Sequence, residues 1–151
     1  MIKDLISLIM PTRKRYSLAS QFIKSLEKQT NNPKKVELLI YIDDDDSESL
    51  NLKSDIIPIK IFIGKRKTMG EYNTYLYNKS VGDIIMLAND DIRILTQSWD
   101  EKIREVHKLF KDKIYLAYPN DLYKGQSLCT FPIISRNTAV KLRRPFPEEY
   151  Q

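Results

Sequence analysis

Two adjacent carboxylates, Asp90 and Asp91, follow a short apolar run and have the residue types and spacing best suited to chemistry. Residues 84–88 are all apolar, which is typical of a strand buried on both faces in a parallel sheet. Open α/β sheets bind their ligands at the carboxyl ends of such strands. Because neighbouring carboxylates repel each other, a divalent cation that prefers oxygen ligands would stabilise them there. Taken alone, residues 89–91 would be interpreted first as a solvated turn that caps a helix, and it is the rest of the chain that favours a binding site.

Two further apolar runs also end in charged residues. Residues 5–10, apolar apart from Ser7, lead to Pro11, Thr12, Arg13, Lys14 and Arg15, and residues 36–42 lead to four consecutive aspartates, Asp43 to Asp46. The carboxyl ends of parallel strands lie at one edge of their sheet, so we expect one basic and two acidic clusters to meet there. A single charged run usually marks a solvated face, but charged runs after successive strands favour a binding site.

Apolar periodicity predicts the elements that position these residues. Strands are expected at residues 5–10, 36–42, 59–63, 84–88, 114–118 and 131–134. Helices are expected to begin near Ser17, Thr68, Ser98 and Ser135, where Thr68 with Glu71 and Ser98 with Glu101 have the spacing of a capping box. Alternating strands and helices predict an α/β fold of three α/β/α layers around a mostly parallel sheet. With no repeat or linker in the sequence, we expect a single domain over residues 1–151.

Composition excludes several classes of site and of protein. The single histidine, His107, is expected at a surface or boundary position, and with the single cysteine, Cys129, it leaves no His triad, His-rich metal site or intrachain disulfide. Four glycines in all leave no Gly-rich phosphate loop. The turn after residue 42 cannot be an EF-hand loop, because Glu48 and Ser54 stand where that loop requires Gly and Glu.

Charge and hydropathy restrict the partners and the location. The net charge of +5 suits an anionic ligand such as a nucleotide, and it also suits weak nucleic-acid binding. No apolar stretch is long enough to span a membrane, and the N-terminal apolar run is too short for a signal peptide. We therefore expect a cytoplasmic protein without a transmembrane segment.

Four segments resemble, in order, the motifs of one enzyme family. They are residues 6–15 with the first strand and its basic loop, residues 37–47 with the acidic turn, Gly70 to Asn73, and residues 82–91 with the Asn-Asp-Asp sequence. Together they resemble the Rossmann-like nucleotide-binding domain of GT-A glycosyltransferases of the family-2-like group, nucleotide-diphospho-sugar transferases. Two departures from the family pattern are Asn89, where the family's D-x-D motif begins with Asp, and Tyr72, where many members have Arg.

The resemblance implies a nucleotide-sugar donor, a UDP-sugar, and a hydroxyl acceptor that the sequence does not identify. It implies that Asp43 accepts a hydrogen bond from the uracil N3–H with Asp45 nearby, and that Asp91 with Asp90 binds Mn²⁺ or Mg²⁺. The residues implied to contact the nucleotide are Pro11, Thr12, Arg13, Arg15, Asp43, Asp45, Lys67, Asn73, Asn89 and Asp90.

The general base is expected after the acceptor-side strand and helix. Glu148 and Glu149 are the candidates, provided that their segment folds over the donor site. The resemblance implies that the chain is short of the family's C-terminal acceptor segment. One alternative is a non-catalytic nucleotide-sugar-binding module that needs a partner chain or a second copy. Another is a basic nucleic-acid-binding α/β domain, which the acidic turns disfavour because they would repel phosphates.

Overall fold

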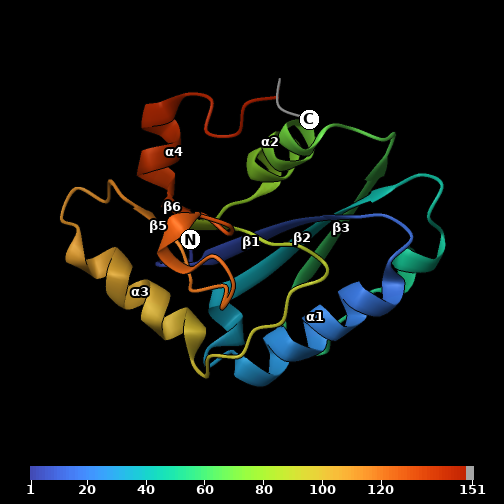
Figure 1. The fold of residues 1–151 in the computed structure, drawn as a ribbon, viewed down its shortest axis with the longest axis horizontal. Helices are drawn as coiled ribbons and strands as arrows, with labels where there is room; N and C mark the ends of the chain where they lie inside the picture. The colour runs from blue at the N-terminus through green and yellow to red at the C-terminus, as the bar shows by residue number, and fades with distance from the viewer. Residues whose placement is uncertain (149–151) are drawn as a thin grey trace.

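The computed structural model describes residues 1–148, which form a six-stranded sheet with helices on both faces (Figure 1). The strands are β1 (Ile6–Thr12), β2 (Val36–Asp43), β3 (Ile59–Gly64), β4 (Ile84–Leu87), β5 (Leu116–Ala117) and β6 (Ile133–Ser135). The helices are α1 (Tyr16–Gln29), α2 (Met69–Lys79), α3 (Trp99–Leu109) and α4 (Arg136–Leu142), with short 3-10 turns η1 (Pro33–Lys35), η2 (Glu48–Asn51) and η3 (Gly125–Ser127).

The sheet has the strand order β3-β2-β1-β4-β6-β5. Strands β1 to β4 pair in parallel, whereas β6 pairs antiparallel with both β4 and β5. Helices α1 and α3 cover one face, and α2 and α4 cover the other (Figure 1). The predicted mostly parallel α/β fold with three layers is confirmed.

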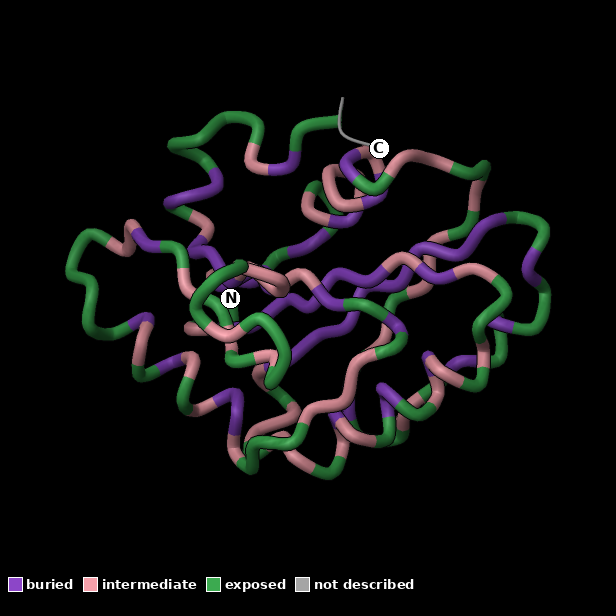
Figure 2. The backbone as a smooth tube through the Cα atoms, in the orientation of Figure 1, coloured by how far each residue is buried: buried purple, intermediate pink, exposed green. Residues whose placement is uncertain are grey.

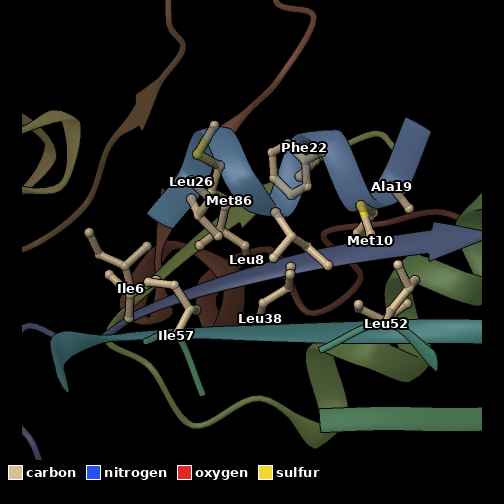
Figure 3. Packing of buried hydrophobic residues seen from close by; sticks show 14 of the residues in the cluster. Ile6, Leu8, Met10, Ala19, Phe22, Leu26, Leu38, Leu52, Ile57 and Met86 are labelled. Atoms are coloured by element: carbon tan, nitrogen blue, oxygen red, sulfur yellow. The ribbon is translucent and has the colours of Figure 1, made fainter. Parts of the chain in front are cut away.

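The core lies on both faces of the central strands, which are buried along their length (Figure 2). Successive side chains of a strand point to opposite faces. Figure 3 shows Leu8 and Met10 of β1 against Phe22 and Leu26 of α1. The intervening residue Ile9 belongs to the cluster on the α2 face. The strongly apolar central strands therefore hold both helical layers, as expected for a parallel sheet.

The helix ends agree with the predicted caps in two cases. Thr68 caps α2 in a capping box, with Glu71 N–H donating to the Thr68 hydroxyl and Thr68 N–H donating to Glu71 Oε2 at 2.7 Å. Ser135 accepts from Thr138 N–H at the start of α4. The second predicted capping box is wrong, because Ser98 makes no side-chain cap; its φ is 55° and its N–H donates to Gln29 O.

Other sequence predictions needed correction. Helix α1 begins at Tyr16, so Ser17 lies inside it and is not the N-cap. His107 is buried, only 5% exposed, and its Nδ1 is 2.9 Å from the Tyr115 hydroxyl, so a surface or boundary position is wrong. The strand expected over residues 114–118 is limited to β5. Over residues 1–148, none of the helices combines the length and apolarity needed to cross a membrane.

A buried carboxylate joins strands at the amino-terminal edge of the sheet. Glu37 of β2 is 4% exposed and accepts from the Ser7 hydroxyl at 2.6 Å, from Lys60 Nζ at 2.8 Å and from Val81 N–H at 3.0 Å. Burial alone would raise the pKa of Glu37, but these hydrogen bonds outweigh burial and lower it. Glu37 therefore stabilises the fold at the edge opposite to the charged strand ends.

Candidate functional site

The carboxyl ends of β1, β2 and β4 bring the predicted charged residues together at one edge. Parallel pairing places Thr12 beside Ile42 and Ile9 beside Leu87, so the residues that follow β2 and β4 flank the end of β1. The Thr12 hydroxyl donates to Asp90 Oδ2 at 2.8 Å, and both side chains are buried. The predicted meeting of one basic and two acidic clusters is confirmed.

Two arginines after β1 each bind one of the two acidic turns. Arg13 donates from Nε to Asp45 Oδ1 at 3.1 Å and from Nη2 to Asp45 Oδ2 at 2.5 Å. Arg15 spans the other turn, with Nη1 3.1 Å from Asp90 Oδ1 and Nη2 3.2 Å from Asp91 Oδ2. Hydrogen bonds from Arg13, and then from Lys14, lower the pKa of Asp45 to about 2. The edge is therefore an interleaved set of cations and anions.

Asp43 is the most deeply buried of the aspartates at this edge, with only 2% of its surface exposed. Its Oδ1 accepts from the Tyr72 hydroxyl of α2 at 2.5 Å. Its Oδ2 lies 3.4 Å from Arg13 Nε, but it accepts no hydrogen bond from any described residue. Burial, followed by donation to Asp43, raises the pKa of Tyr72 to about 12, so Tyr72 stays a hydrogen-bond donor at neutral pH. A buried oxygen that lacks a hydrogen bond is costly, so Asp43 Oδ2 is a candidate acceptor for a ligand's N–H or O–H group.

Asp90 and Asp91 have different surroundings at the end of β4. Asp90 is 5% exposed, and burial raises its pKa against the opposing effects of Thr12 and Arg15. Asp91 is exposed, as is Asn89, whose side chain has no partner within residues 1–148. Over those residues no group of three or more His, Cys, Asp or Glu side chains is arranged to hold a metal.

The donor set at this turn nevertheless fits a hard cation in part. Asp91, Asp90 and the amide oxygen of Asn89 are oxygen ligands of the kind that Mn²⁺ and Mg²⁺ accept. Arg15 already places one positive charge across both carboxylates. A divalent ion here would need further ligands, which the phosphates of a bound molecule could supply.

The remaining predicted nucleotide-binding residues lie at the border of this edge. Pro11 is half-buried within β1. Lys67 Nζ lies 6.0 Å from the centre of the Tyr41 ring, between β3 and α2. Asn73 follows Tyr72 on α2, and its half-buried side chain has no partner among the described residues.

Glu148 lies against the beginning of α2. Its carbonyl oxygen accepts from the Thr68 hydroxyl at 3.2 Å, and Phe146 packs on Tyr77 with ring centres 5.9 Å apart. Gly70 permits this approach, because a Cβ there would lie 2.0 Å from Pro147 O. The backbone of Glu148 thus packs against the start of α2, the helix whose Tyr72 donates a hydrogen bond to Asp43. Glu149, the other candidate base, lies outside the described residues.

Sequence reasoning missed two side chains of the site. Tyr72 was identified as a departure from the family pattern and not as a residue of the site, yet it donates to Asp43. Its spacing of four from the buried Leu76 was the available signal that Tyr72 faces the sheet. Asp46 accepts from Lys14 N–H at 2.6 Å and from Ser49 N–H at 3.2 Å, and so fixes the two turns against each other.

Comparison with known proteins identifies the fold. No protein-family model and no curated protein sequence matches the chain. The solved structure of the mannosyltransferase PcManGT from Pyrobaculum calidifontis, in complex with GDP-Man and Mn²⁺, is similar with a TM-score of 0.76, at 12% identity, over 99% of this chain and 49% of that one. The chain has the GT-A fold.

A second protein with the GT-A fold gives the same result. The 1–349 fragment of S. aureus TarS is similar with a TM-score of 0.68, at 14% identity, over 96% of this chain and 51% of its own. The same fragment in complex with UDP-GlcNAc has a TM-score of 0.66, at 15% identity, over 96% of this chain and 49% of its own. The chain therefore spans about half the length of these solved chains.

Proposed function

We propose that the charged edge of this GT-A fold binds a nucleotide-sugar, a UDP-sugar, and that the chain acts in transferring the sugar to an acceptor hydroxyl. The observation that supports this most strongly is Asp43, a buried carboxylate with one oxygen that lies 3.4 Å from Arg13 Nε but accepts no hydrogen bond from any described residue. The uracil N3–H is a hydrogen-bond donor, and Asp43 Oδ2 has no such donor among the described residues. PcManGT and TarS, which share the fold, have been solved with GDP-Man and with UDP-GlcNAc respectively.

The rest of the edge would position the nucleotide around that contact. Tyr72 holds the carboxylate of Asp43 in place through a hydrogen bond, and Arg13 lies beside it. Thr12 and Asp90 would lie near the ribose, and Arg15 would bring positive charge toward the diphosphate. Pro11, Asp45, Lys67, Asn73 and Asn89 complete the proposed contacts.

A divalent ion, Mn²⁺ or Mg²⁺, would be held by Asp91 with Asp90. When bound, it would stabilise the negative charge that grows on the diphosphate leaving group. Because the chain offers few oxygen ligands at this turn, we expect nucleotide and metal to bind together.

Transfer also requires that the acceptor hydroxyl lose a proton. Glu148 is the described candidate for this general base, since its segment docks on the start of α2 beside the proposed nucleotide site. General-base catalysis typically contributes about 10²–10⁴-fold. Glu148→Gln should therefore lower the transfer rate and leave UDP affinity unchanged, and an unchanged rate would place the base elsewhere.

Calorimetric titration tests the proposal. UDP, GDP and CDP are titrated into the protein with Mn²⁺ and with a chelator; we expect UDP to bind with Mn²⁺ and to lose affinity in the chelator. Asp91→Ala should abolish the metal-dependent part. Asp55→Ala, which removes an exposed carboxylate outside the site, is the matched control and should not. UDP binding that is equally strong in the chelator would show that the metal assignment is wrong, and no nucleotide binding at all would refute the function.

A further inference from the structure

A large cavity lies beside the strand-end site and has no role in the function proposed above. It has a volume of about 840 Å³ and lies between α3, residues 91–96 and the chain from β5 to β6. Figure 1 shows the segment after β4 running across to the start of α3 on this face of the sheet. Its volume is within the range of about 300–1,000 Å³ that is usual for small-molecule pockets.

The lining of the cavity is mainly apolar. Its walls include Met86, Ile92, Trp99, Ile103, Phe131 and Ile133. Several of these side chains also belong to the main core, but they leave this volume unfilled. Apolar walls of this extent favour a hydrocarbon or ring system over a polar ligand.

The charged residues of the lining are almost all engaged. Arg93 donates to Gln21 Oε1 and to the Ile92 carbonyl oxygen. Asp121 accepts from three backbone N–H groups of its own loop and from Thr130. Lys102 is exposed, and its side chain has no partner within residues 1–148. The cavity therefore presents no buried unpaired charge that would oppose an apolar ligand.

One residue joins this cavity to the proposed donor site. Asp91 lines the cavity and also pairs with Arg15, which in turn pairs with Asp90 at the end of β4. A ligand in the cavity would therefore have one end beside the carboxylate that we assign to the metal and the diphosphate.

We propose that this cavity binds the apolar part of the acceptor, which is an amphiphile with a hydrocarbon tail. The tail occupies the cavity between α3 and the sheet, and the hydroxyl-bearing end lies at Asp91. Binding of the tail needs only the cavity, whereas its role as acceptor rests on the proposed function. Each added CH₂ should tighten binding by up to about fourfold, because the free energy gained on burial is roughly the same for every CH₂ group.

Trp99 makes the test direct, because it is the chain's single tryptophan and lines the cavity. Its fluorescence is followed while methyl, hexyl and octyl β-glucosides are added below micelle-forming concentrations. We expect a saturable change with hexyl and octyl glucoside, tighter for octyl, and none with methyl glucoside. No saturable response to the octyl compound would overturn the proposal, and UDP binding in the same sample would show that the donor site is intact.

Variants that fill the cavity provide a second test, which concerns where the octyl glucoside binds. Ala117→Phe and Val106→Phe add a ring from β5 and from α3, and each should weaken octyl glucoside at least tenfold without changing UDP affinity. Val140→Phe places the same ring at an exposed position on α4 and should change neither. Unaltered octyl glucoside affinity in a folded Ala117→Phe or Val106→Phe variant would overturn the proposed location.

The acceptor role has its own readout. With the glucose head beside Asp91, saturating octyl glucoside should change UDP affinity at least threefold, and methyl glucoside should not. Octyl glucoside binding with unchanged UDP affinity would overturn the acceptor role. Octyl glucoside binding without any UDP binding would refute the proposed function as well, so the two failures can be distinguished.

Discussion

Replacing Tyr72 by Phe removes one hydroxyl and tests how Asp43 is held. That hydroxyl donates to Asp43 Oδ1 at 2.5 Å, and the other carboxylate oxygen already lacks a hydrogen bond within the described chain. After the substitution, the ion pair with Arg13 at 3.4 Å is the one remaining hydrogen bond or ion pair of the carboxylate within residues 1–148. Because the Tyr72 ring packs on Tyr41 with ring centres 5.0 Å apart, Phe should fill the same space.

The loss is therefore that of a hydrogen bond to a charged group, about 1.5–3 kcal/mol of the free energy of unfolding. For a domain of this size, this lowers Tm by about 3–12 °C. Urea and thermal unfolding at pH 7 measure it.

Tyr75→Phe is the matched control on the same helix. The Tyr75 ring packs on Tyr41 and Phe62, but its hydroxyl makes no hydrogen bond with residues 1–148. Tyr75→Phe should change the free energy of unfolding by less than about 0.5 kcal/mol. Equal stability of the two variants would refute the account of Asp43 as a carboxylate that Tyr72 holds in place.

Two further predictions concern the scaffold. Thr68→Ala should destabilise the fold by about 1 kcal/mol because it removes the cap of α2, whereas Ser98→Ala, at a helix start with no side-chain cap, should have a smaller effect in the same urea titration. The pKa of Glu37 is below its unfolded value of 4.5, so its contribution is fully present above that pH and is lost as pH falls through the folded pKa. Glu37→Gln should therefore cost stability at pH 7 and less at pH 3; an equal cost at both would contradict this.

The strand-end site could be predicted because the pattern that marks it lies within short segments of the sequence. Apolar runs followed directly by charged residues mark the carboxyl ends of buried strands, and parallel pairing then brings those ends to one edge. That argument placed Thr12 near Asp90 although they are far apart in the sequence, and the structure joins them by a hydrogen bond.

What the sequence did not reveal depends on contacts between distant segments. A run of four aspartates gives no indication that Asp43 turns inward, because its burial depends on Tyr72 from α2. Ser98 has the spacing of a capping box with Glu101, but its backbone takes a left-handed conformation and bonds the end of α1. His107 is buried because β5 brings Tyr115 against its ring. In each case, tertiary contacts outweighed the local pattern.

The ratio of UDP to CDP affinity tests the central claim most directly. Cytosine lacks the N3–H group from which Asp43 is proposed to accept a hydrogen bond. With Mn²⁺ the intact protein should therefore bind UDP more tightly than CDP. Asp43→Ala should weaken UDP by about 1–3 kcal/mol, or about 5- to 150-fold, and bring the ratio close to one. Asp44→Ala, which removes the exposed neighbour, should leave both affinities unchanged. Equal UDP and CDP affinity in the intact protein, or an unchanged ratio in Asp43→Ala, would contradict the account.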